Sequence, residues 1–153
     1  MKLKIKFASD YVRQIYQKSE KRGIEWSRGD SGIDLRSVED DLILQPGETK
    51  IIDSGVACEI SDCDGDCYEI QLRPRSGLTK AGILGHFGTI DFAYRGFIGM
   101  SVTNISGAPF EIKKGERIKQ MIVAPILKPV IEFCDDLSNT ERGAGGFGST
   151  GRA

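Results

Sequence analysis

The amino-acid sequence predicts an all-β fold. Short apolar runs recur along the chain, some of them alternate with charged residues, and turn-forming residues separate them. Alternation places apolar side chains on one face of a strand, and glycine, proline and aspartate break strands at turns. Runs and turns at this spacing are typical of a β-sandwich or β-barrel.

The length of 153 residues suits one domain with a hydrophobic core. We expect this domain to span residues 1–137, followed by a flexible glycine-rich tail over 138–153. In the domain, Leu3, Ile5 and Phe7 alternate with lysines and predict the first strand. One helix is predicted next, over 10–21, and a polar stretch follows it to residue 28. The apolar residues that share a face of this helix are Tyr11, Val12, Ile15 and Tyr16.

Five apolar runs predict the later strands. These runs are Leu42–Leu44, Lys50–Ile52, Tyr68–Leu72, Phe97–Val102 and Arg117–Leu127. Turn chemistry lies between them, at Gln45–Glu48, Asp64–Gly65, Ser106–Pro109 and Lys113–Glu116.

The balance of charge excludes broad classes of partner. With 21 basic and 22 acidic residues the net charge is -1, so no bulk attraction to nucleic acid or to a membrane surface is expected. The chain shows neither the apolar run of a signal peptide nor the length of apolar sequence that spans a bilayer. We therefore expect a soluble cytoplasmic protein in which any anion site is local.

Three of the four cysteines, Cys58, Cys63 and Cys67, lie close together in the sequence. Zinc sites usually combine two ligand pairs, and no second cysteine pair or matching histidine is present. The aspartates around Asp64 faintly resemble a calcium loop but lack its distal glutamate. A polar turn with reduced thiols nearby is the favoured interpretation. The single histidine, His86, excludes histidine-pair metal sites.

The glycine-rich tail has the composition of a phosphate-binding segment. Its glycines satisfy the spacing G-x-G-x-x-G, but too few residues follow to form the helix on which such motifs depend. A mobile tail remains, able to close over a nucleotide with charge from Arg142, donors from Ser149 and Thr150, and a flat face from Phe147. A terminus without a task is the alternative.

Three further segments carry candidate chemistry. The run Arg73–Gly77 ends a predicted strand with two guanidinium groups, a hydroxyl and a flexible turn, which suits phosphate. Asp91 lies among apolar neighbours in a predicted hairpin, where desolvation or a neighbouring triphosphate favours proton acceptance and Arg95 or a metal opposes it. Alternation predicts Ile118 and Gln120 on one strand face, from which Gln120 can donate to phosphate. The alternatives are a surface turn, an aspartate that stabilises a turn, and a glutamine that bonds backbone.

Taken together, five segments in this order resemble the trimeric deoxyuridine triphosphatase (dUTPase) family. They are Asp30–Arg36, Pro74–Gly77, Gly88–Asp91 with Tyr94–Gly96, Gly115–Gln120 and Arg142–Gly151. The resemblance implies a homotrimer of β-barrel or jelly-roll subunits with shared active sites. It also implies hydrolysis of dUTP to dUMP and pyrophosphate with Mg²⁺.

The resemblance assigns roles to residues at both ends of the reacting nucleotide. Asp91 matches the general base that activates water for in-line attack on the α-phosphorus. Tyr94 matches the aromatic residue under the deoxyribose, and backbone around Gly88 and Ile90 matches the part that reads uracil. Phosphate contacts match Arg75, Ser76, Gly77 and Gln120, and the closing tail matches Arg142, Phe147, Gly148, Ser149 and Thr150.

Mg²⁺ would be held mainly by the triphosphate and water, with Asp34 near the metal-bound water. The chain departs from the family pattern at Gly85-His86-Phe87 and in the long polar stretch 17–28. Two rival functions remain: a dCTP deaminase-like enzyme of the same fold, and a non-catalytic protein gated by dUTP.

Overall fold

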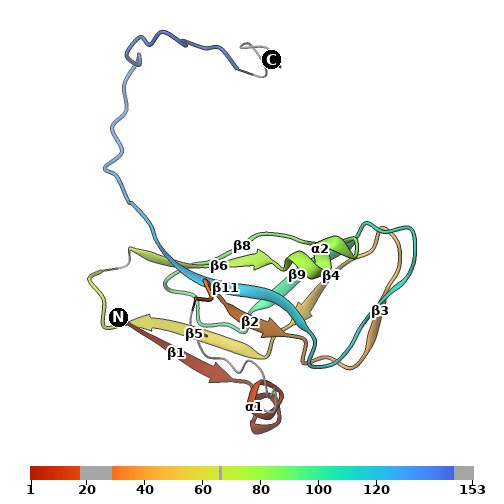
Figure 1. Cartoon of the computed structure of the whole chain (residues 1–153). Coiled ribbons are helices and arrows are strands. Elements are labelled where there is room, and N and C mark those ends of the chain that lie inside the picture. Colours follow the sequence, from red (N-terminus) through yellow and green to blue (C-terminus); the bar gives the residue numbers. More distant parts are fainter. Residues whose placement is uncertain (18–28, 66, 147–153) are drawn as a thin grey trace.

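A computed structural model describes residues 1–17, 29–65 and 67–146 of the chain (Figure 1). Strands make up most of its regular structure, which confirms the predicted all-β class. In chain order the strands are β1 Lys2–Phe7, β2 Ile33–Arg36, β3 Leu42–Leu44, β4 Thr49–Asp53, β5 Val56–Ser61, β6 Tyr68–Pro74, β7 Ile83–Gly85, β8 Gly88–Ile90, β9 Gly99–Asn104, β10 Phe110–Ile112 and β11 Arg117–Pro125. The helices are α1 Asp10–Gln17 and α2 Ser76–Lys80.

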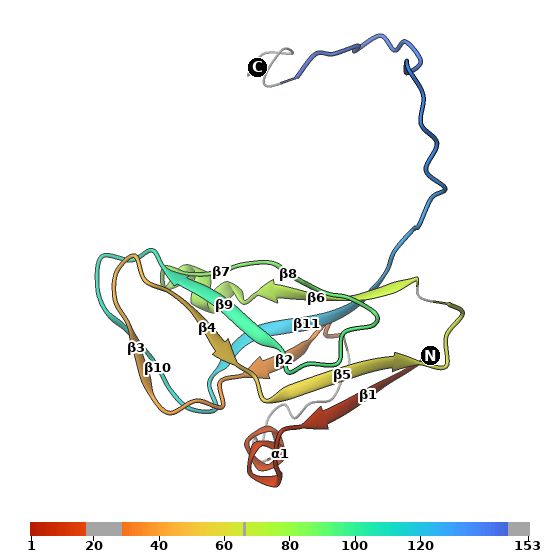
Figure 2. The same cartoon turned by 180° about the vertical axis from the view of Figure 1, so that it is seen from behind.

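The strands form small antiparallel sheets that enclose one core. The largest sheet has the order β2-β11-β6-β8, and a three-stranded sheet has the order β4-β9-β7. Two pairs, β1-β5 and β10-β3, complete the arrangement. Figure 2 shows from behind how these pieces surround a common interior. Strands far apart in sequence are therefore neighbours, as in a jelly roll.

The core takes one face of each sheet. Leu35, Ile52, Met100, Ile112 and Met121 are buried and come from five different strands. In β9 buried and more exposed residues alternate, as a sheet with one face on a core requires. Apolar burial of this extent is the main favourable term in folding.

Helix α1 closes one end of the barrel through Tyr16. This residue is fully buried. Its hydroxyl accepts a hydrogen bond from the Arg36 N–H at 3.0 Å and donates one to the Ser54 carbonyl at 2.9 Å. Burial raises the pKa of Tyr16. The predicted helix is confirmed as far as Gln17, and the rest of its predicted span, with the polar stretch at 18–28, lies outside the described residues.

Some elements differ from the prediction. Strands β2, β5, β7 and β10 were not predicted as strands. Strand β5 is buried almost continuously, so it lacks the alternation that marks a strand in sequence. The residues after Arg75 form the short helix α2 in place of the predicted flexible turn.

A bulge in β11 changes which side chains face the core. Arg117 pairs with Arg36, and Lys119 pairs with the adjacent Leu35. The chain therefore advances two residues along β11 for one residue along β2, which leaves one extra residue in β11. Ile118 and Lys119 are consequently both buried, although they are consecutive. The predicted simple alternation, with Ile118 and Gln120 on one face, is wrong for this reason.

The chain leaves the barrel after β11. The described residues 126–146 contain no helix or strand, are largely exposed, and lead away from the sheets (Figure 1). The boundary expected at residue 137 stays a prediction. No helix of the described residues has the length and apolar character needed to cross a bilayer.

Candidate active site

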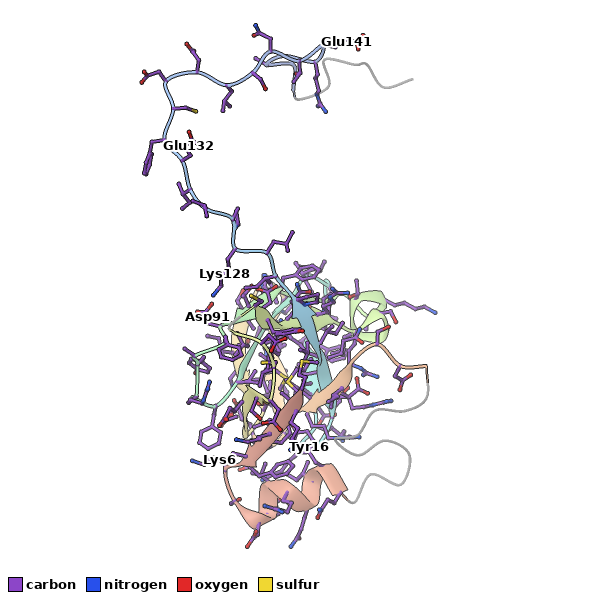
Figure 3. All side chains as sticks on the ribbon, turned by 90° about the vertical axis from the view of Figure 1, so that its left-hand side faces the viewer. Lys6, Tyr16, Asp91, Lys128, Glu132 and Glu141 are labelled. Atoms are coloured by element: carbon purple, nitrogen blue, oxygen red, sulfur yellow. The ribbon has the colours of Figure 1, made fainter. Side chains whose placement is uncertain are left out.

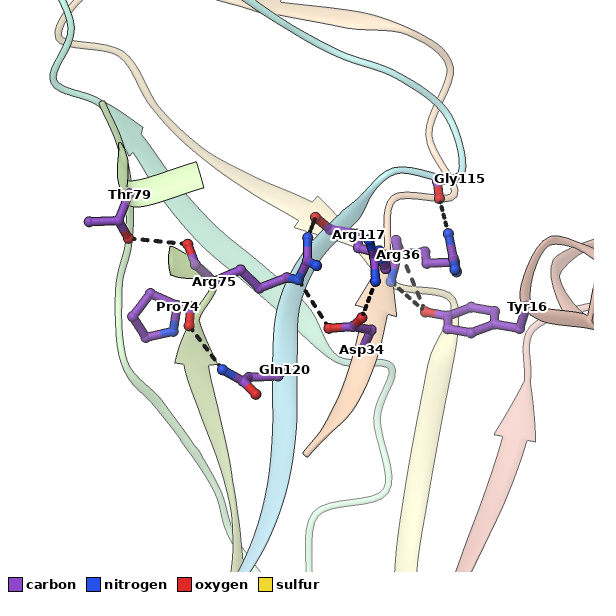
Figure 4. Close-up of polar contacts among 9 residues, drawn as sticks. All are labelled: Tyr16, Asp34, Arg36, Pro74, Arg75, Thr79, Gly115, Arg117 and Gln120. Atoms are coloured by element: carbon purple, nitrogen blue, oxygen red, sulfur yellow. Dashed lines mark hydrogen bonds and ion pairs between the residues drawn. The ribbon is translucent and has the colours of Figure 1, made fainter. Parts of the chain in front are cut away.

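An arginine cluster occupies one end of the largest sheet, and we define it as Asp34, Arg75 and Arg117 (Figure 4). Asp34 Oδ1 lies 3.0 Å from Arg75 Nε, and its Oδ2 lies 3.0 Å from Arg117 Nη1. Arg75 Nη1 also donates to the Arg117 carbonyl at 3.1 Å. One half-buried carboxylate therefore orients two guanidinium groups, which keep an excess of positive charge.

Strand pairing explains this cluster. Asp34 of β2 lies opposite Gln120 of β11, and Gln120 lies opposite Arg73 of β6. Three adjacent strands thus bring residues from distant parts of the sequence to one level of the sheet. Next to the cluster, the Arg36 guanidinium donates to the Gly115 carbonyl at 2.7 Å. Burial, and then the charge of Arg117, lowers the pKa of Arg36.

The other predicted phosphate contacts lie at the same end. Gln120 Nε2 donates to the Pro74 carbonyl at 3.3 Å. Ser76 and Gly77 begin α2 directly after Arg75 and are exposed. The structure therefore brings four predicted residues together: Arg75, Ser76, Gly77 and Gln120.

Asp91 lies just beyond β8 and is exposed in the isolated chain. It borders a cavity of about 200 Å³, and Figure 3 shows it where the chain begins to leave the barrel near Lys128. The other lining residues are Tyr68, Glu69, Phe92, Ala93, Ile126 and Lys128. The apolar neighbours expected from sequence are only partly present, since the carboxylate faces solvent.

Tyr94 is held in place by the turn that follows Asp91. Its backbone N–H donates to the Asp91 carbonyl at 2.9 Å, and its hydroxyl donates to the Phe97 carbonyl at 3.1 Å. A Cβ atom on Gly96 would overlap the Tyr94 ring, so only glycine allows this close approach. Tyr94 remains 45% exposed, and its ring offers a flat apolar surface beside the carboxylate.

The two groups of predicted residues lie at opposite ends of the β6–β8 pair. Ile90 pairs with Ile70, and Gly88 with Leu72, so Asp91 falls at the level of Glu69. Positions 69 and 75 are six steps apart along β6 and its end, which at about 3.3 Å per step corresponds to about 20 Å. The structure of one chain therefore does not bring Asp91 and Arg75 together.

The tail is described only as far as residue 146. Arg142 is exposed, and its Nε donates to the Gly145 carbonyl at 2.9 Å. The segment that carries it leads away from the barrel (Figure 1). Phe147, Gly148, Ser149 and Thr150 lie outside the described residues, so their predicted roles stay predictions.

Two residues of β11 were not predicted as site residues. Arg117 binds Asp34 from within a motif that was already singled out, and its fixed charge was the available signal. Lys119 donates from its Nζ to the His86 carbonyl and is only 1% exposed. No sequence pattern indicated its burial, because that follows from the bulge.

In the part of the chain that the structure describes, the cysteines and acidic residues form no metal cage. Among the described residues, no group of three or more histidine, cysteine, aspartate or glutamate side chains has the arrangement of a metal site. All four cysteines are free. Cys58 is buried in β5, where burial raises its pKa to about 12, whereas Cys63 and Cys67 lie in the predicted turn before β6.

Comparisons with known proteins agree on one family. A family model described as dUTPase matches residues 25–151. The deoxyuridine 5'-triphosphate nucleotidohydrolase of Nautilia profundicola is 47% identical over 156 residues, covering 99% of this chain and 100% of the relative. That of Methylocella silvestris is 46% identical over 133 residues, covering 83% of this chain and 81% of the relative.

Solved structures show the same fold. A mutant Staphylococcus bacteriophage 80alpha dUTPase with dUpNHpp aligns with a TM-score of 0.80 and 25% identity, covering 99% of each chain. A mutant dUTPase from phage phi11 of S. aureus, solved for its structural Mg(II) ion, aligns with a TM-score of 0.72. It is 19% identical over 91% of this chain and 100% of that chain, and supports the fold alone.

Proposed function

Because this chain belongs to the dUTPase family, it hydrolyses dUTP, and we propose that Asp91 is the base of that reaction. Asp91 would accept a proton from a water molecule aligned with the α-phosphorus. The water oxygen forms a bond to that phosphorus as the bond to the bridging oxygen breaks, which yields dUMP and pyrophosphate. Asp91 is exposed beside a cavity in the isolated chain, so its carboxylate is accessible to a water molecule.

The phosphate end supplies charge that is oriented before substrate arrives. Asp34 and the Arg117 carbonyl hold two nitrogens of Arg75, and among the described residues none is paired with Nη2. We expect this nitrogen to bind a phosphate oxygen, with Ser76, Gly77 and Gln120 beside it. Phosphoryl transfer depends on such positioning and charge stabilisation more than on covalent chemistry.

The hairpin end supplies recognition of the nucleoside. We expect backbone around Gly88 and Ile90 to bind the uracil edge and the Tyr94 ring to pack under the deoxyribose. The bonds that Tyr94 makes to Asp91 and Phe97 support this role, since a fixed ring leaves little room for a 2′-hydroxyl. Arg142, Phe147, Gly148, Ser149 and Thr150 would close over the bound nucleotide.

A divalent cation fits the phosphate end only through the substrate. Both oxygens of Asp34 already accept bonds from arginines, so this carboxylate is poorly placed to bind a metal directly. We propose that Mg²⁺ enters with the triphosphate and keeps most of its water, with Asp34 near that water. When bound, Mg²⁺ would neutralise part of the negative charge on the triphosphate.

The separation between the two ends of the β6–β8 pair is the observation that supports an oligomeric assembly. The strand register puts Asp91 and Arg75 about six steps, or about 20 Å, apart along β6, too far to act on one triphosphate. We therefore propose a homotrimer in which one chain's Asp91 meets another's Arg75. The exposed segment after β11 supports contact between chains. Five of its large apolar side chains are at least 78% exposed in the isolated chain: Leu127, Val130, Ile131, Phe133 and Leu137.

A cytoplasmic location is also proposed. The four free cysteines suit a reducing compartment, and the substrate is a soluble nucleotide. Detection of the chain in fractionated cells tests this proposal.

One assay tests the function directly. The purified chain is incubated with dUTP or dCTP in the presence of Mg²⁺, and pyrophosphate and ammonia are measured. We expect pyrophosphate from dUTP and no ammonia from dCTP. Ammonia from dCTP would indicate the deaminase, and tight binding of dUTP without pyrophosphate would indicate a non-catalytic binding protein.

A further inference from the structure

Lys119 is an unusual residue for the interior of this barrel. It is 1% exposed and lies on β11 next to Gln120. Buried lysines are rare unless they are paired, and no salt bridge of Lys119 with a described carboxylate is found. Burial lowers its pKa to about 8, so keeping it inside costs stability. A lysine retained at such a cost suggests a specific task.

The Lys119 amine donates to the carbonyl of His86, which lies in the short connection between β7 and β8. Extending the β6–β8 register by two residues places Pro74 opposite His86. Proline has no backbone N–H to offer across a ladder. The amine therefore provides a donor at a position where strand β6 cannot.

Gly85 packs against Pro74 beside the lysine stem. Gly85 is buried, and a Cβ atom there would lie 3.1 Å from Pro74 Cβ and 3.6 Å from Lys119 Cε. The rest of the connection is held from the other side, where the His86 N–H donates to the Ser101 carbonyl at 3.1 Å. His86 Nε2 also lies 2.7 Å from Thr103 Oγ1. Lys119 thus completes a two-sided clamp at the start of β8.

We propose that Lys119 is a positioning residue that sets specificity for the base by fixing the start of β8. This inference rests on the proposed function, in which the backbone around Gly88 and Ile90 reads uracil. Because Gln120 is its neighbour, Lys119 also ties the base-reading strand of one chain to the strand that carries the phosphate contact. Its own amine contacts the backbone and not the substrate.

The test is Lys119→Met, which keeps an unbranched side chain of similar length and removes the amine. Exposed Lys113→Met is the matched control. Because the lost bond positions a binding surface, we expect KM for dUTP to rise about tenfold with kcat within about threefold, the pattern of lost uniform binding. The ratio of kcat/KM for dUTP to that for dTTP should fall by at least as much, while the control matches wild type.

Gly85→Ala provides a second variant that keeps the amine but presses a Cβ atom against Pro74 beside the lysine stem. It should move KM and the dUTP to dTTP ratio in the same direction as Lys119→Met. The proposal is overturned if both variants fold and assemble like wild type and keep wild-type KM and selectivity. It is also overturned if Lys119→Met lowers only kcat, or if it does not fold and Gly85→Ala keeps wild-type selectivity. Failure of the wild-type chain to hydrolyse dUTP would instead reject the proposed function.

Discussion

The two ends of the β6–β8 pair differ in how complete they are within one chain. At the phosphate end, Arg75 is bound to Asp34 at 3.0 Å and to the Arg117 carbonyl at 3.1 Å, so its charge is fixed before substrate binds. At the other end, Asp91 is exposed and borders a small open cavity. The first region is preorganised by its own fold. The second is a reactive carboxylate far from the guanidinium groups of Arg75 and Arg117, which is why we expect a neighbouring chain to provide the phosphate-binding arginines.

We expect the largest loss of activity from Asp91→Asn, at the exposed end of the β6–β8 pair. It removes the proton acceptor without changing the shape of the hairpin, so kcat should fall about 10²- to 10⁴-fold while KM changes little. Steady-state release of pyrophosphate from dUTP measures both. Exposed Asp64→Asn is the control and should behave like wild type. A parallel loss of dUTP affinity would make Asp91 a structural residue.

Removal of residues 142–153 tests the role of the C-terminal tail, which belongs to neither end of the β6–β8 pair. We expect kcat/KM to fall about 100-fold, because ordering of the tail provides closure over substrate and no core packing. A chain that lacks only residues 151–153 is the control. Size-exclusion chromatography should show the same assembly for all three proteins. Dissociation of the shortened chain would assign the tail to assembly.

Arg75→Lys sharpens the account of the phosphate end. Lysine keeps the charge but loses the planar fork that bonds Asp34 and the Arg117 carbonyl together. We expect kcat/KM for dUTP to fall about 10- to 100-fold, from pyrophosphate assays. Arg73→Lys is the matched control, since Arg73 is exposed and, among the described residues, its guanidinium bonds only Gln71. Equal effects of both substitutions would contradict a special role for Arg75.

The smallest expected effect concerns stability, at the buried amine of Lys119. Its pKa is lowered from 10.5 to about 8 in the folded chain. Between these values the unfolded chain binds more protons, so the free energy of unfolding gains a contribution that rises with pH, by about 1.4 kcal/mol per unit at most. Urea unfolding of wild type and Lys119→Met at pH 7.5 and pH 9.5 should show a relative gain for wild type. If the free energy of unfolding changes equally with pH in the two proteins, the lowered pKa of Lys119 is contradicted.

Sequence alone predicts the parts of the fold where local pattern and tertiary position agree. The alternation of Leu3, Ile5 and Phe7 predicted β1, and the long apolar run from Arg117 predicted β11. Strand β2 escaped prediction because its Ile33-Asp34-Leu35-Arg36 is short. Short strands depend on partners that are distant in sequence, so their own residues carry little signal.

The site divides in the same way. Motif residues such as Arg75 and Asp91 were recognisable from their segments, and three strands do bring Arg75, Asp34 and Gln120 together. The pairing of Arg117 with Asp34 and the burial of Lys119 were not predicted. Both depend on strand register and on the bulge in β11, which are properties of backbone pairing between distant segments.

Mixing two inactive variants tests most directly whether the two ends meet between chains. Asp91→Asn and Arg75→Ala chains are unfolded together in equal amounts, refolded, and assayed for pyrophosphate from dUTP. If each site takes Asp91 from one chain and Arg75 from another, random trimers should recover about a quarter of wild-type activity. Correctly sized mixed trimers without activity would show that both residues must come from the same chain, and would contradict the shared site.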